Sequence, residues 1–69
     1  MAIQHKKEFG IYHWDTFDNE TLLVDEADTV EQAVKKVEKR YRNRIRGDGA
    51  DKVEIVDSKG NVKKSFNIG

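Results

Sequence analysis

Cysteine and proline are both absent from this 69-residue chain. Without cysteine the chain has no disulfide framework and no thiolate ligands for a structural zinc ion. Small secreted domains usually depend on disulfides, so we expect this protein to be cytoplasmic. Without proline there is neither a rigid linker nor a proline-rich ligand motif.

Long apolar runs are also missing. No stretch approaches the roughly 20 apolar residues that a membrane-spanning helix needs. The residues that follow Met1 include no apolar core of the kind found in a secretory signal peptide. We therefore expect a protein without membrane contact.

The length and the charge balance favour one folded domain over residues 1–69. Apolar residues make up 36% of the chain and charged residues 38%, and the mean hydropathy is −0.84. Such a polar composition raises the question of disorder. The apolar residues nevertheless fall into periodic segments, and the zero net charge creates no large self-repulsion, so we expect the chain to fold.

One amphipathic helix is predicted over about residues 30–45. Thr29 and Gln32 have the spacing of a capping box at its start, and Gly47 suits the residue that follows a helix end. One face of this helix is apolar, with residues at helical spacing: Val30, Ala33, Val34, Val37, Tyr41 and Ile45.

A β-hairpin is predicted at the end of the chain. Residues 53–57 are rich in β-branched side chains, and residues 62–68 alternate between apolar and polar. Gly60 between them supplies the left-handed residue of a short loop. The residues expected to face the helix are Val53, Ile55, Val62 and Phe66.

The front half of the chain predicts a second hairpin. Residues 9–17 and 22–24 form two apolar segments, and residues 18–20 have turn chemistry. Gly10 is a candidate for a bulge or kink in the first strand. The predicted fold is therefore α+β: an antiparallel ββαββ domain, in which two hairpins form one sheet with a single helix packed on one face.

The motifs of the second half resemble a group of small ββαββ domains of unknown function from bacteria and phages. The residues that carry the resemblance are Thr29–Val34 and Gly49–Val62, within roughly the last 40 residues. They are motifs of a capped helix and a hairpin, so the resemblance implies a fold and no activity.

Residues that could carry catalysis or bind a metal are few. His13 and Asp15 share one face of a strand and could begin a metal site, but further ligands are not specified. Neither serine stands in a motif with histidine, and the carboxylates are scattered. We expect no enzyme, no cofactor and no small-molecule substrate.

The two signs of charge are segregated along the chain. Residues 15–31 contain seven acids and no base, whereas residues 35–46 contain one acid and seven bases: Lys35, Lys36, Lys39, Arg40, Arg42, Arg44 and Arg46. These bases suit the phosphates of a nucleic acid. They equally complement the helix macrodipole, or could be neutralised by the acidic hairpin. Sequence alone leaves these interpretations open.

The sheet face opposite the helix predicts a surface for a partner. The apolar residues considered for this face are Tyr12, Trp14, Leu23 and Val56. An apolar patch rimmed by charge often marks an interface. We therefore predict a small interaction or accessory module that binds a protein partner or a second copy of itself, with nucleic-acid binding through residues 35–46 as the alternative function.

Overall fold

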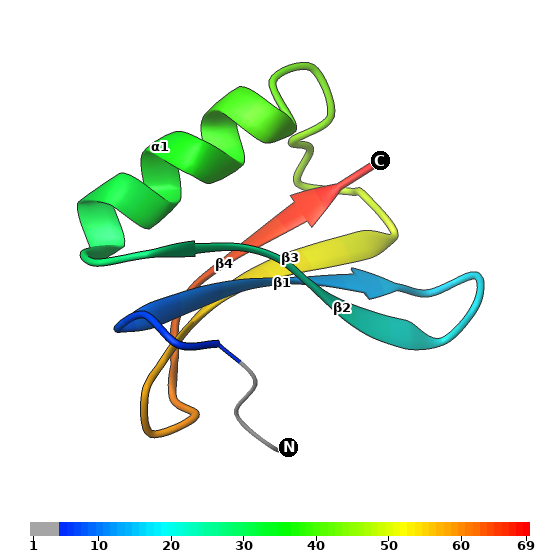
Figure 1. Cartoon of the computed structure of the whole chain (residues 1–69). Coiled ribbons are helices and arrows are strands. Elements are labelled where there is room, and N and C mark those ends of the chain that lie inside the picture. Colours follow the sequence, from blue (N-terminus) through cyan, green and yellow to red (C-terminus); the bar gives the residue numbers. More distant parts are fainter. Residues whose placement is uncertain (1–4) are drawn as a thin grey trace.

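The computed structural model describes residues 5–69, which form four β-strands and one α-helix in the predicted order ββαββ (Figure 1). The strands are β1 (Phe9–Asp15), β2 (Glu20–Ala27), β3 (Asp51–Asp57) and β4 (Val62–Ile68), and the helix is α1 (Val30–Arg40). Among these described residues, no helix has the length and apolar character needed to cross a membrane.

The strands form a single antiparallel sheet in the order β2-β1-β3-β4. Each hairpin pairs its own two strands, and β1 pairs with β3 to join the hairpins. Strands β2 and β3 therefore run parallel on either side of β1, and α1 connects them across one face (Figure 1). This arrangement leaves β2 and β4 as the two edge strands of the sheet.

The core lies between α1 and this sheet face. The apolar stripe of the helix supplies Ala33, Val37 and the residue after its end, Tyr41. The sheet supplies alternate residues of the central strands and the ends of the edge strands: Ile11, Ala27, Val53, Ile55 and Ile68. The predicted stripe is confirmed up to Tyr41, because alternation in the strands and helical spacing place these side chains toward one another.

The start of the helix is as predicted, but its end is not. The Gln32 backbone N–H donates to Thr29 Oγ1 over 3.1 Å, which is the expected cap. The helix ends at Arg40, five residues before the predicted end, and Gly47 does not have a left-handed conformation. The physical reason is a bridge between Ile45 and Ile68, which draws the chain onto β4 instead of continuing the helix.

Bulges in both hairpins alter which residues face the core. A register shift between Ile55 and Val56 places Val62 opposite Val56, so that Val62 is 50% exposed and does not face the helix as predicted. The first hairpin has its shift after Ile11, and the extra residue is on β2 rather than at Gly10.

Gly10 instead allows a close approach by the segment before β1. A Cβ at Gly10 would lie 2.4 Å from His5 Nδ1, so only glycine lets the imidazole lie against the sheet there. His5 Nδ1 is 2.9 Å from Tyr12 Oη, and the Glu26 carboxylate accepts the backbone N–H groups of Lys6 and Lys7. The segment before β1 therefore covers part of the outer sheet face.

This cover corrects the prediction for the outer face. Tyr12 is 2% exposed and Val56 is 3% exposed, so neither presents a surface to a partner. Trp14 and Leu23 lie on the same face and remain partly exposed. The outer face is accessible toward the turn of the first hairpin, beyond the segment that holds His5.

Candidate functional site

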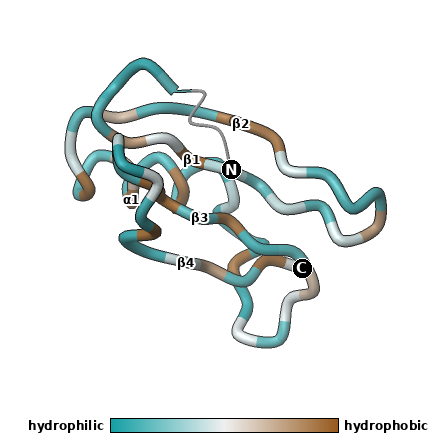
Figure 2. The backbone as a smooth tube through the Cα atoms, turned by 90° about the horizontal axis from the view of Figure 1, so that it is seen from below, coloured by the Kyte–Doolittle hydropathy of each residue, from teal (hydrophilic) through white to brown (hydrophobic). Residues whose placement is uncertain are grey.

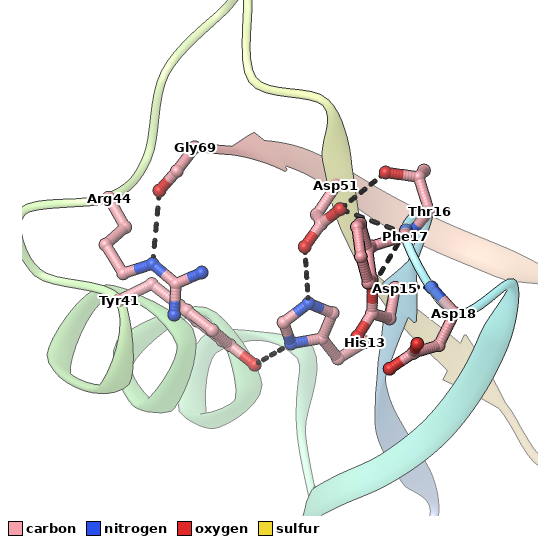
Figure 3. A network of polar contacts seen from close by, with 9 residues as sticks. All are labelled: His13, Asp15, Thr16, Phe17, Asp18, Tyr41, Arg44, Asp51 and Gly69. Atoms are coloured by element: carbon pink, nitrogen blue, oxygen red, sulfur yellow. Dashed lines mark hydrogen bonds and ion pairs between the residues drawn. The ribbon is translucent and has the colours of Figure 1, made fainter.

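A chain of polar contacts joins the first hairpin to the end of the helix and the start of β3. His13 of β1 is at its centre (Figure 3). His13 Nδ1 lies 3.0 Å from Tyr41 Oη, and His13 Nε2 lies 3.2 Å from Asp51 Oδ2. The imidazole also packs edge-on against the Tyr41 ring. Three segments distant in sequence therefore meet at one half-buried side chain.

Asp51 extends this chain to the hairpin turn. Its Oδ1 accepts the Thr16 hydroxyl over 2.7 Å and the Thr16 backbone N–H over 3.1 Å. These hydrogen bonds from Thr16, followed by the one from His13, lower the pKa of Asp51 from 3.8 to about 2. Asp51 is therefore ionised at neutral pH and fixes the hairpin turn against β3.

The ionised state of Asp51 determines the proton positions on His13. A carboxylate only accepts, so His13 Nε2 carries a proton and donates it to Asp51. In the neutral imidazole Nδ1 then accepts from the Tyr41 hydroxyl. The order hydroxyl, imidazole, carboxylate is that of an activated nucleophile. Tyr41 is only 3% exposed, however, so its hydroxyl is closed to substrate and the contacts hold the fold together.

Asp15, the residue paired with His13 in the metal hypothesis, has a different role. Its Oδ1 accepts the backbone N–H groups of Phe17 and Asp18 over 2.9 and 3.3 Å, which stabilises the turn after β1. Within residues 5–69, no group of three or more histidine or acidic side chains is arranged to hold a metal ion.

The turn and its flanking strands expose an apolar surface. Trp14 is 39% exposed, Phe17 93% and Leu22 52%. Trp14 pairs with Thr21 and Tyr12 pairs with Leu23, so Trp14 and Leu23 are diagonal neighbours on the outer face. We call Trp14, Phe17, Leu22 and Leu23 the hairpin surface. It includes both faces of the hairpin, because Leu22 pairs with His13 and lies on the helix side of the sheet, opposite to Trp14 and Leu23. Figure 2 shows the hydrophobic stretch on β2 and the hairpin extending away from the other elements.

Acidic side chains surround this surface. Asp18 lies in the turn, Asp15 and Glu20 flank it at the ends of β1 and β2, and Asp25 and Glu26 follow the apolar part of β2. Lys36 reaches Asp25 over 3.5 Å from the helix and donates to the Glu26 carbonyl oxygen over 2.6 Å. The rim near the turn is thus anionic, whereas at the far end of β2 the helix partly neutralises the negative charge.

The predicted basic residues are divided between the helix and the loop that follows it. Lys35, Lys36, Lys39 and Arg40 lie on α1, and Arg42, Arg44 and Arg46 lie in the loop. All are exposed except Lys36, which is partly buried. Arg44 extends over the Tyr41 ring at 5.6 Å and its Nε donates to Gly69 O.

Sequence reasoning missed Phe17, Leu22 and the role of Asp51. The apolar pattern predicts that Phe17 and Leu22 belong to strands, whereas Phe17 lies in the turn and Leu22 lies on the edge strand β2, where both are exposed. The contact between His13 and Asp51 spans 38 residues, so local spacing carried no signal for it.

Comparison with protein-family models, with curated proteins and with solved structures found no match. The resemblance to small ββαββ domains of unknown function therefore stays a prediction from the sequence.

Proposed function

We propose that this domain is a cytoplasmic protein-interaction module that binds an extended segment of a partner protein along β2, with the hairpin surface as its apolar contact. The observation that carries the proposal is the exposure of Trp14, Phe17 and Leu22 at the uncovered end of the first hairpin. Apolar patches rimmed by charge often mark protein-binding sites.

The geometry of β2 supports strand addition as the mode of binding. As an edge strand, β2 has backbone N–H and C=O groups along its free edge that do not pair with another strand of the sheet. An extended segment can pair with such an edge, while alternate side chains contact the apolar residues beside it. Leu22 and Leu23 point to opposite faces and would contact alternate residues of the partner.

The charges indicate the chemistry of the partner segment. Glu20 lies at one end of β2, and Asp25 and Glu26 lie at the other. A segment with apolar residues flanked by lysine or arginine would complement this pattern. Two copies of β2 paired antiparallel would instead place Glu20 near Glu26 at both ends, and like charges that face each other destabilise the pairing. The proposed partner is therefore a foreign chain.

The test is selection of binding peptides from a displayed random library. We expect enrichment of sequences that combine apolar and basic residues, with NMR shift changes confined to residues 14–24. The double variant Trp14→Ser/Leu22→Lys should bind these peptides at least tenfold more weakly. Val62→Ser removes an equally exposed apolar residue from β4 and is the matched control.

Two results would contradict the proposal. Enriched peptides whose shift changes map to β4 or to the helix would place the binding site elsewhere. Sedimentation velocity of the domain alone should give a monomer, and growth of the sedimentation coefficient with concentration would make a second copy the partner.

A further inference from the structure

Residues 35–46 concentrate the positive charge of the domain. We call their seven bases the basic segment. With Glu38 included, residues 35–46 carry a net charge of +6, and the rest of the chain carries −6. A domain with zero net charge thus has a strong internal separation of charge. The fold can either neutralise the positive charge of this segment or leave it accessible to a ligand.

The fold leaves most of the basic segment without a counter-ion. Among residues 5–69, its one ion pair joins Lys36 to Asp25 at 3.5 Å. The acidic hairpin therefore neutralises only part of the segment, through Asp25, which pairs with Lys36 and is also attracted by the nearby charge of Arg40. Six side chains of the basic segment form no ion pair in the described part of the chain: Lys35, Lys39, Arg40, Arg42, Arg44 and Arg46.

Three of the four cations of the helix, Lys36, Lys39 and Arg40, lie toward one flank, and Lys35 lies between them and the acids. Successive residues turn by about 100°, so Glu31 and Glu38 fall on one flank, and Lys36 and Arg40 fall on the other. Lys36, Lys39 and Arg40 line a shallow hollow beside Asp25, the one acid in its lining. The hollow therefore has an excess of positive charge.

The loop holds its arginines on an ordered backbone. The Arg46 N–H donates to Asn67 O over 2.8 Å, and the Gly69 N–H donates to Arg44 O over 2.8 Å. Between them Ile45 forms its bridge to Ile68. Arg44 Nε donates to Gly69 O, and a Cβ at Gly69 would lie 3.3 Å from Arg46 Cδ, so both arginine side chains lie beside the end of β4. Tyr41, buried at the start of the loop, anchors it to the core.

We propose that the basic segment binds the phosphate backbone of a nucleic acid, a function on a different surface from the protein-binding site. Lysine and arginine side chains that neutralise phosphates release condensed counterions, which drives sequence-independent binding. The opposite charge on the remainder of the domain orients the basic segment toward the polyanion. The contacts involve phosphates, so binding is independent of base sequence.

The same observations disfavour a membrane surface as the ligand. A helix that binds a lipid bilayer inserts its apolar face among the acyl chains. The apolar face of α1 is occupied by the core, where Ala33 and Val37 are fully buried. The helix offers charge alone to the outside, which suits a soluble polyanion.

The test is fluorescence anisotropy of labelled single-stranded DNA, duplex DNA and RNA. We expect binding at about 50 mM salt that weakens about 20-fold by about 150 mM salt for a single strand that makes about four phosphate contacts. Lys39→Glu/Arg42→Glu should weaken binding at least tenfold. Lys63→Glu/Lys64→Glu makes the same change in net charge on β4 and should weaken it less than threefold.

Folding of each variant is checked by circular dichroism, and Lys39→Gln/Arg42→Gln replaces the reversal variant if that variant does not fold. Binding by Lys39→Gln/Arg42→Gln should be about fivefold weaker than binding by the unmodified domain. The absence of binding to all three nucleic acids at low salt would overturn the proposal. So would an equal loss of binding in the two charge-reversal variants, or binding to anionic vesicles of phosphatidylserine without binding to nucleic acid.

Discussion

His13 Nε2 and Asp51 Oδ2 lie 3.2 Å apart, although 38 residues separate them in the chain. The contact ties β1 to the start of β3, the other central strand, at the end where the first hairpin projects. Because Asp51 also accepts two hydrogen bonds from Thr16, a single carboxylate positions the turn that presents the hairpin surface. The structural network and the proposed protein-binding site are therefore linked.

Asp51 should make the stability of the domain sensitive to acid. Its pKa is lowered from 3.8 to about 2 in the folded state, so its contribution is complete above about pH 5 and is lost as the pH falls through about 2. Asp51→Asn should lower the free energy of unfolding at pH 7 and flatten its decline between about pH 5 and pH 2. Urea unfolding followed by tryptophan fluorescence across this pH range measures both effects.

Asp48→Asn is the control, because Asp48 lies in the loop that leads to β3, is exposed and forms no hydrogen bond or ion pair within residues 5–69. Its unfolding should match that of the unmodified domain at each pH. An equal change in the two variants would mean that the hydrogen bonds of Asp51 do not stabilise the fold.

The helix cap gives a second prediction. Thr29→Ala removes the hydroxyl that accepts the Gln32 N–H and should lower the free energy of unfolding by about 1 kcal/mol. Thr29→Ser keeps an acceptor at the same position and should retain most of the stability. Urea titration monitored by far-UV circular dichroism compares the two, and equal losses would show that the hydroxyl is not the cause.

The sequence predicted the elements that depend on local patterns. The cap at Thr29, the stripe through Val37 and the left-handed Gly60 all follow from spacing and residue type, and the structure confirms each of them. The end of the helix could not be predicted in this way. It depends on the bridge between Ile45 and Ile68, which is a contact between distant parts of the chain.

The candidate site could be predicted less well from the sequence, because it also depends on contacts between distant parts of the chain. A bulge of one residue reverses the faces of a strand, as it does for Val62, and no residue type marks its position with certainty. Burial of Tyr12 depends on His5, which precedes the sheet. The basic segment was visible from charge alone, yet its division between helix and loop needed the tertiary structure.

A charge placed in the helix stripe should unfold the domain. Val37 is fully buried, so Val37→Asp introduces an uncompensated buried carboxylate at a cost of about 3–5 kcal/mol. A domain of this size has a total stability of about 5 kcal/mol, so we expect loss of the folded state at room temperature. Lys35→Asp introduces the same side chain on the exposed side of α1 and should leave the domain folded. NMR dispersion of the amide signals distinguishes the two.

Two glycines in the loop before β3 should respond in opposite ways to alanine. A Cβ at Gly49 would lie 2.2 Å from the carbonyl oxygen of Ile68, which is backbone of the adjoining strand and has little freedom to move. Gly49→Ala should therefore lower the free energy of unfolding by about 2–3 kcal/mol, at the upper end of the usual cost of overpacking. The φ angle of Gly49 is not positive, so this cost arises from the contact rather than from backbone strain.

Gly47 is two residues away and is the matched control. A Cβ there meets no atom within 4 Å, and its φ angle is not positive either. Gly47→Ala should be neutral or stabilise the domain by about 0.4–1 kcal/mol, because alanine restricts the unfolded chain. Thermal unfolding of both variants measures the difference. If Gly49→Ala melted at the same temperature as the unmodified domain, the loop would not lie against β4. The loop would then not hold Arg44 and Arg46 on an ordered backbone.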